Sequence, residues 1–281
     1  LGMLSGALVA WGARPRFAHF GPSNASWIVD LVVGSAAAAL LNGASNVLNQ
    51  VYDVEIDRIN KPGRVLPSGR LSPRAALAIA AALYAVSLSA ACTINFQCFV
   101  LFVAGAVSTV LYSAPPFRLK RFVWVSNLTI AIPRGVLLKV AGWSVAKSVW
   151  SPEAWFIGLV FGLFLFGATS SKDFADMEGD RAGGIDTVPL RYGQHTAVKL
   201  MYPFFTLPFL LLAAGTIGGV FSGNRVLLVI LGLACAAWGH WVTRLLLRDP
   251  SERLTENHPS WRQMYYLMFA LQVGLMIAYI V

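Results

Sequence analysis

Most of the carboxylates in this sequence lie in two short stretches, where their spacing follows the helical repeat. Eight of the 13 Asp and Glu residues fall within 53–57 or 173–186. Positions separated by three or four residues share one face of a helix, so each stretch predicts a face rich in oxygen ligands. The first acidic set is Asn49, Asp53 and Asp57, and the second acidic set is Asp173, Asp176 and Asp180.

Such faces are suited to a hard cation and a phosphate group. Like charges one turn apart repel, so the pattern destabilises a helix unless something neutralises it. Mg²⁺ is held by a few carboxylates together with phosphate oxygens of a substrate. Nearby cations would help to neutralise a diphosphate and the charge that develops as it leaves. Basic residues beside the acidic sets are Arg58, Lys61, Arg64, Arg70, Arg118, Lys120, Lys172 and Arg181.

Two simpler interpretations of these charges stay open. The acidic sets could be solvated loops whose carboxylates balance neighbouring arginines, although six groups at helical spacing in two places favour a site. Each basic residue, taken singly, could instead anchor a loop at a membrane surface. The two acidic sets together therefore carry more weight than any one residue.

The elements that must position these faces are membrane helices. Of 281 residues, 57% are hydrophobic and 12% charged, against roughly 25% charged in soluble domains. This composition excludes disordered, coiled-coil and collagen-like chains and argues against a soluble enzyme. Apolar runs near the span length of about 20 residues predict an all-α bundle of nine transmembrane helices. They cover approximately 1–12, 26–48, 73–92, 97–113, 122–146, 152–171, 197–219, 224–247 and 261–281.

The basic residues predict how this bundle is oriented. With nine spans, the loops 49–72, 114–121, 172–196 and 248–260 lie on one side, which holds 16 of the 22 Lys and Arg residues; the other side holds 4. The positive-inside rule makes the first side cytoplasmic. The net charge of +9 thus reflects topology and not nucleic-acid binding. The three cysteines have no metal-ligand spacing, and we expect the first helix to be truncated.

The span 122–146 carries polar residues that a lipid-facing helix would avoid. Asn127 and Arg134 are seven residues apart and are expected to share a face, and Pro133 is expected to kink the helix. A mid-span arginine requires a cavity or a partner. We expect Arg134 to reach a diphosphate or an acidic acceptor group, with a structural pairing as the alternative. Lys139 is expected to extend toward the membrane surface, and His240 to be a packed or interfacial histidine.

On these motifs the sequence resembles the UbiA superfamily of intramembrane prenyltransferases. The resemblance covers most of the chain and implies one domain over 1–281, with nine helices around a central cavity beneath a cytoplasmic cap. It also implies Mg²⁺-dependent transfer of a prenyl group from an isoprenyl diphosphate to a lipophilic or aromatic acceptor. The matching stretches are Asn49-x₃-Asp53-x₃-Asp57, Asn60-Lys-Pro-Gly-Arg64-Val-Leu-Pro-Ser68-Gly69, Tyr112-Ser-Ala-Pro-Pro-Phe-Arg118-Leu-Lys120 and Lys172-Asp173-x₂-Asp176-x₂-Gly179-Asp180-Arg181.

The resemblance also implies roles for individual residues. The first acidic set would hold one Mg²⁺ ion and the diphosphate, and the second acidic set would hold another. Residues that would contact the diphosphate or the reacting carbon are Tyr112, Arg118, Lys120 and Lys172. Independently of the resemblance, further candidates for substrate binding are Arg64, Ser68, Asn127 and Arg134. The ubiquinone and menaquinone branches often have Tyr-x₃-Lys, whereas here Pro116 stands four residues after Tyr112.

The form Tyr-Ser-Ala-Pro-Pro is closer to the homogentisate, chlorophyll and geranylgeranylglyceryl phosphate branches. We therefore expect an aromatic acceptor of the quinone or tocopherol-precursor type first, then a glycerol phosphate lipid, then a tetrapyrrole. A cation transporter that uses the acidic sets is the alternative from another class. Transporter sites usually lie near the bilayer midplane, whereas these carboxylates lie at helix ends, which counts against it.

Overall fold

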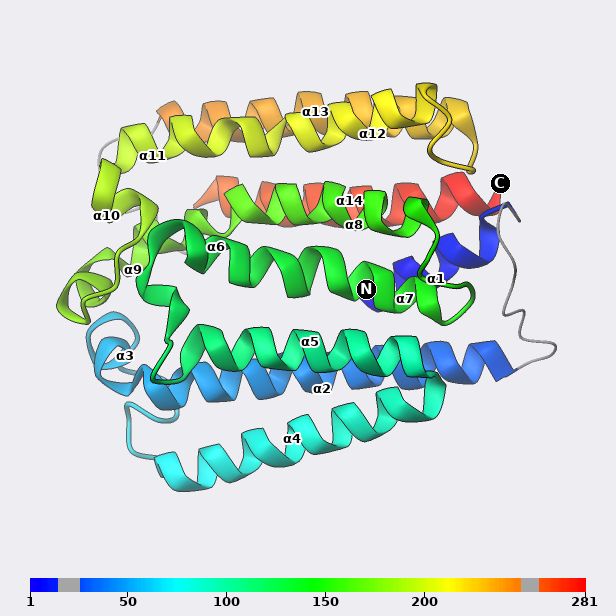
Figure 1. Cartoon of the computed structure of the whole chain (residues 1–281). Helices are drawn as coiled ribbons and strands as arrows, with labels where there is room; N and C mark the ends of the chain where they lie inside the picture. Colours follow the sequence, from blue (N-terminus) through cyan, green and yellow to red (C-terminus); the bar gives the residue numbers. More distant parts are fainter. Residues whose placement is uncertain (15–25, 249–257) are drawn as a thin grey trace.

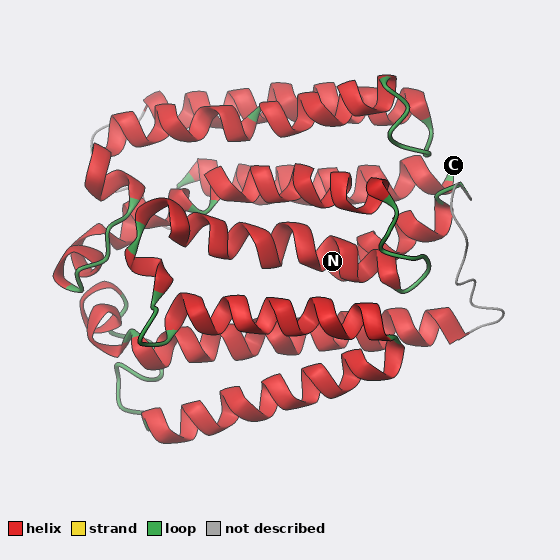
Figure 2. Ribbon diagram, viewed as in Figure 1, coloured by secondary structure: helices red, strands yellow, loops and turns green. Residues whose placement is uncertain are grey.

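The computed structural model describes residues 1–14, 26–248 and 258–281, and in these ranges every regular element is a helix (Figure 2). Eight helical stretches are long and apolar enough to cross a membrane. The remaining predicted span, 1–12, corresponds to α1 (Gly2–Gly12), which is too short to be counted with these eight. The all-helical membrane bundle is therefore confirmed, with eight full spans. They are Trp27–Tyr52, Pro73–Ile94, Phe96–Ser113, Val123–Ser144, Pro152–Ala182, Gln194–Ile217, Arg225–Arg248 and Pro259–Ile280.

In Figure 1 the spanning helices run side by side, and the polar connections gather at one end. That end carries three short helices, α3 (Val54–Asn60), α9 (Ser170–Ala182) and α10 (Val188–Tyr192). We call these three helices the cap. Much of the predicted loop 172–196 is thus helical. Of the loop 248–260, residues 249–257 lie outside the described residues.

Both acidic sets lie where a spanning helix meets a cap helix. α2 (Ser26–Tyr52) ends one residue before Asp53, and α3 begins one residue after it, so the first acidic set spans two helices instead of the single helix expected. α8 (Pro152–Ala168) and α9 are likewise separated only by Thr169. As expected from Pro62 and Gly63, α3 ends at Asn60.

The span that carries Pro133 is divided into three parts. α6 (Val123–Ala131) and α7 (Leu138–Ser144) are joined by a π-helical segment over Ile132–Leu137. Proline removes a backbone donor from the helix, and such wide turns often accompany functional sites. A side chain at Gly135 would place Cβ 2.6 Å from the Gly162 Cα of α8, so only glycine permits this approach. The predicted disruption at Pro133 is therefore a wide turn packed closely on α8.

The remaining spanning helices complete the wall of the bundle. They are α4 (Pro73–Ile94), α5 (Phe96–Ser113), α11 (Gln194–Met201) with α12 (Leu207–Ile217), α13 (Arg225–Arg248) and α14 (Pro259–Ile280). α14 packs against both α1 and α13. The cysteines Cys92, Cys98 and Cys235 are all free, in agreement with their ordinary spacing in the sequence.

Candidate active site

A cavity of about 770 Å³ extends into the bundle from beneath the cap, and all six residues of the two acidic sets line it. The part farther from the cap is walled mainly by apolar side chains, among them Leu101, Phe102, Phe161 and Phe164. A cavity that is charged at one end and apolar along the rest suits a substrate with a charged head and a hydrocarbon tail.

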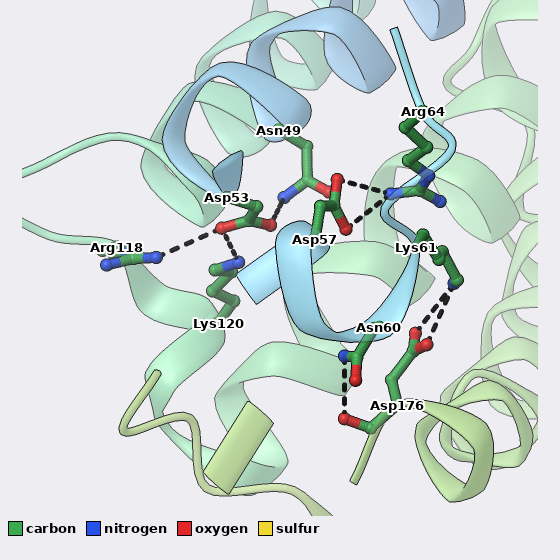
Figure 3. A network of polar contacts seen from close by, with 9 residues as sticks. All are labelled: Asn49, Asp53, Asp57, Asn60, Lys61, Arg64, Arg118, Lys120 and Asp176. Carbon is green, nitrogen blue, oxygen red and sulfur yellow. Dashed lines mark hydrogen bonds and ion pairs between the residues drawn. The ribbon is translucent and has the colours of Figure 1, made fainter. Parts of the chain in front are cut away.

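Asp53 is a buried carboxylate at the charged end that binds two cations. It is 7% exposed and accepts hydrogen bonds from Asn49 Nδ2 at 2.8 Å, from Arg118 Nη2 at 3.1 Å and from the Lys120 ammonium (Figure 3). Burial lowers the pKa of Lys120, while the charge of Asp53 opposes this change. Two cations held on one buried carboxylate form a positive patch, part of which is available to a phosphate.

Asp57 lies one turn farther along, on α3, and is 5% exposed. Arg64 Nη1 lies 2.8 Å from each of its carboxylate oxygens (Figure 3). Arg64 comes from the loop that follows α3, and it lines the cavity together with Asp57. The arginine of the Arg64–Ser68 motif therefore lies on the first acidic set, and its predicted contact with the substrate stays a prediction.

Asn60 and Lys61 join the two acidic sets, a role that the sequence did not reveal. Asn60 Nδ2 donates to the Asp176 carbonyl at 3.0 Å, and Asn60 Oδ1 accepts from the Gly179 amide at 2.8 Å. Lys61 Nζ lies 3.0 Å from Asp176 Oδ1 (Figure 3). One feature of the sequence could have indicated the role of Asn60: it lies three residues after Asp57 and so continues the polar face of the first acidic set.

Gly179 of α9 and Gly183, the residue that follows α9, allow α3 to approach this closely. A Cβ at Gly179 would lie 2.5 Å from Asn60 Nδ2, and one at Gly183 would lie 2.5 Å from Ile56 Cδ1. The two glycines are four residues apart, and they face two side chains of α3, Asn60 and Ile56, that are also four residues apart. The separation of the two acidic sets is therefore set by side chains of α3 that pack directly on these glycines.

The second acidic set faces the same cavity from α9. Asp173 is buried, and Asp173, Asp176, Asp180 and Lys172 all line the cavity. Tyr112, from the end of α5, interacts electrostatically with Lys172 and Asp173 and also lines the cavity. The structure thus brings Tyr112 and Lys172 to the carboxylates.

The donor set fits Mg²⁺ bound jointly with a substrate. Among the described residues, no three Asp, Glu, His or Cys side chains converge enough to hold a metal ion without other ligands. The second acidic set is therefore not a preformed three-carboxylate site, and Asp176 is turned toward Lys61. Mg²⁺ typically takes one or two carboxylates and completes its coordination with water and phosphate oxygens. Carboxylates that line a common cavity from two helices are ligands of this kind.

Three predicted substrate contacts lie outside the cavity lining. Ser68 is exposed and accepts a hydrogen bond from Arg70 Nε at 3.0 Å within its loop. Arg118 binds Asp53 without lining the cavity itself, and its Nη2 also donates to the Tyr52 carbonyl at 3.1 Å. Asn127 is 2% exposed and donates to the Phe166 carbonyl and to Ser170 Oγ, both at 2.7 Å.

Asn127 therefore serves helix packing in this arrangement. Replacing it by leucine is expected to destabilise the protein by about 1–2 kcal/mol, because two buried acceptors at the α8–α9 junction lose their donor. Thermal unfolding in detergent measures this loss, and kcat/KM per folded molecule is expected to stay within about twofold of the unchanged protein. A rise in KM with unchanged stability would instead place Asn127 in substrate binding.

Arg134 and Lys139 both line the cavity. Arg134 is exposed to that space and donates to Asn46 Oδ1 at 3.2 Å, in accord with an arginine that requires a cavity. Lys139 is 3% exposed and points inward, so the expectation that it extends to the membrane surface is wrong. His240 is exposed and shares a 2.8 Å hydrogen bond with Tyr202, as an interfacial histidine would.

Known proteins share both this sequence pattern and this fold. The pattern of the UbiA prenyltransferase family matches residues 3–273. The chain is 28% identical over 258 residues to homogentisate phytyltransferase from Synechocystis sp., covering 88% of this chain and 83% of that protein. It is 27% identical over 255 residues to digeranylgeranylglyceryl phosphate synthase from Methanosphaera stadtmanae, covering 89% and 86%.

A solved structure has the same fold. The UbiA homologue from Archaeoglobus fulgidus bound to DMAPP and Mg²⁺ superposes with a TM-score of 0.76 at 19% identity, covering 99% of this chain and 94% of that one. The family pattern, which extends over nearly the whole chain, agrees with the two acidic sets at the charged end of an intramembrane cavity. The chain therefore belongs to the UbiA prenyltransferase family and is a multi-pass membrane enzyme that transfers a prenyl group from an isoprenyl diphosphate.

Proposed function

We propose that this enzyme prenylates an aromatic acceptor of the quinone or tocopherol-precursor type, with Mg²⁺, at a site on the cytoplasmic side of the membrane. The observation that carries the proposal is the pairing of the two acidic sets on α3 and α9 above an apolar cavity. The motif from Tyr112 to Pro116 is common to the homogentisate, chlorophyll and geranylgeranylglyceryl phosphate branches, and among these the similarity to a homogentisate phytyltransferase supports the aromatic acceptor.

In this proposal the charged end binds the diphosphate. Asn49, Asp53 and Asp57 would hold one ion and Asp173, Asp176 and Asp180 a second. Bound Mg²⁺ would neutralise the negative charge of the diphosphate while the allylic C–O bond breaks. Lys120 and Lys172 donate hydrogen bonds to the diphosphate oxygens, and Arg64 exchanges part of its contact with Asp57 for the same group.

The apolar part of the cavity holds the hydrocarbon tail and excludes water from the reacting carbon. When the C–O bond breaks, its electron pair leaves with the diphosphate and the allylic carbon becomes cationic. Tyr112 lines the cavity next to Lys172, where its ring face stabilises that cation. A ring carbon of the acceptor then forms the new C–C bond and gives its proton to the departing diphosphate. Arg134, exposed within the cavity, holds an oxygen of the acceptor.

Release of diphosphate by purified protein in detergent tests this proposal. Geranylgeranyl diphosphate is supplied with either Mg²⁺ or EDTA, and with homogentisate, 4-hydroxybenzoate or geranylgeranylglyceryl phosphate. We expect release that requires Mg²⁺ and one aromatic acceptor, and that falls below about 1% when EDTA removes the metal. Release with only the glycerol phosphate lipid would contradict the aromatic acceptor. Absence of release with every acceptor, from protein shown to be folded, would contradict the whole proposal.

A further inference from the structure

The apolar part of the cavity contains one buried ammonium group, far from the acidic sets. Lys139 of α7 is 3% exposed and lines the cavity. Its Nζ donates to Ser5 Oγ and lies 3.4 Å from the Gly2 carbonyl oxygen, both on α1, and donates to Gln272 Oε1 of α14 at 3.0 Å. Lys139, Gln272 and Ser5 together form what we call the polar wall.

The polar wall lies deep in the cavity. Tyr112 and Ser126 line the cavity near the second acidic set, and Lys139 follows Ser126 by 13 residues in the same span. At the helical rise of 1.5 Å per residue, the two positions are about 20 Å apart along the axis. The apolar side chains of Leu137, Phe161 and Phe164 line the same cavity. A prenyl tail with its diphosphate at the acidic sets therefore points along apolar side chains toward Lys139.

The polar wall is difficult to move. The Lys139 ammonium is held by three oxygens from two other helices, and it lies 3.9 Å from the centroid of the Phe161 ring. Among the described residues no carboxylate contacts it, and the hydroxyl of Ser5 and the amide oxygen of Gln272 are its side-chain partners. A tail that displaced the side chain would leave a buried amino group and its oxygen partners without hydrogen bonds, which costs more than moving a flexible apolar group.

We propose that Lys139, held by Ser5 and Gln272, ends the tail-binding part of the cavity and thereby limits the length of the prenyl diphosphate that this enzyme accepts. This inference rests on the proposed binding of the diphosphate at the acidic sets. Lys139 acts here as a specificity-determining residue that closes the far end of the tail-binding section. The polar wall favours tails that fill the apolar section without reaching the ammonium.

The binding of unreactive donors measures this limit. Thiolo analogues of geranylgeranyl and solanesyl diphosphate, which keep the tail but resist cleavage, are titrated with Mg²⁺ into the purified protein. We expect the unchanged protein to bind the shorter analogue at least about tenfold more tightly, and Lys139→Met to reduce this preference about tenfold. Gln272→Leu, which removes one of the oxygens that hold Lys139, is expected to shift the preference in the same direction.

Lys147→Met is the matched control. Lys147 follows α7, lies outside the cavity lining and donates to the Ala13 carbonyl, so its replacement is expected to leave the preference unchanged. Equal binding of both analogues by the unchanged protein would overturn the inference, whether or not the variants fold. So would a Lys139→Met variant that keeps the preference but binds homogentisate more weakly, because Lys139 would then recognise an acidic acceptor.

The same titration separates this inference from the proposed function. Failure of the unchanged protein to turn over any donor contradicts the proposed transfer, but it leaves the measured preference between the two unreactive analogues intact. A preference that does not change in Lys139→Met or Gln272→Leu contradicts the polar wall, even when turnover is normal.

Discussion

Replacing Asp176 by asparagine is expected to lower kcat for diphosphate release by at least about a thousandfold, equivalent to about 4 kcal/mol of transition-state stabilisation. The carboxylate of Asp176 lines the cavity on α9 and faces the first acidic set through Lys61. Asparagine keeps the size of the side chain and the main-chain carbonyl that Asn60 contacts. The substitution therefore keeps the Asn60 contacts between α3 and α9 and removes the carboxylate charge that faces the cavity and Lys61.

Single-turnover kinetics with geranylgeranyl diphosphate and titrated Mg²⁺ measure this effect. Glu178→Gln is the matched control, since Glu178 lies on the same helix, is exposed and does not line the cavity. The control is expected to keep its activity within about twofold, as surface substitutions usually do. Activity in Asp176→Asn that matches the control, in folded protein, would show that the second acidic set takes no part in the reaction.

Substituting Gly179 by alanine is expected to lower kcat/KM about a hundredfold without removing any ligand. The new Cβ would lie 2.5 Å from Asn60 Nδ2, so α3 and α9 must separate or Asn60 must turn away. Either change moves the two acidic sets relative to each other, and displacements of about 1 Å in catalytic groups cost this much. The concentration of Mg²⁺ that gives half-maximal activity is expected to rise in parallel, since fewer ligands meet the ion together.

Gly63→Ala serves as the comparison for this variant. Gly63 lies in the loop after α3, and a Cβ there meets nothing within 4 Å. We expect it to retain the activity and the Mg²⁺ requirement of the unchanged protein. A Gly179→Ala protein that keeps its Mg²⁺ requirement while only its thermal stability falls would show that the contact through Asn60 stabilises the cap and does not position the carboxylates.

Local spacing predicted the residues that meet beneath the cap. Spacings of three and four residues predicted that Asp53, Asp57 and Asp173 share a site with their sets, and all three line the cavity. Counting apolar runs brought both acidic sets to one end of the bundle, as Figure 1 shows for the cap. Both inferences depend on properties that neighbouring residues determine, namely helical phase and span length.

Helical phase failed where the helix itself changes. Asn127 and Arg134 were expected to share a face, but the π-helical segment begins at Ile132, between them. A wider turn alters the angle between residues on either side, so Asn127 packs on α8 while Arg134 faces the cavity. Pro133 indicated a disruption, but the sequence did not specify its kind.

Partners distant in sequence were invisible for a different reason. Lys139 resembles other long basic side chains near the end of a span, and only the positions of Ser5 and Gln272 turn it inward. Asn60 similarly gains its role from the Asp176 carbonyl and the Gly179 amide. Such contacts depend on the packing of whole helices, which residue spacing does not encode.

The single-residue joints at Asp53 and Thr169 couple the membrane interior to the cap. α2 and α8 line the tail-binding space, and each continues through one residue into the helix that carries carboxylates. We therefore expect a tail that changes the tilt of α2 or α8 to change the distance between α3 and α9 as well, because each pair of helices is joined by one residue. Donor and metal affinities are then reciprocally linked, so that each strengthens the other to the same degree when the tail fits.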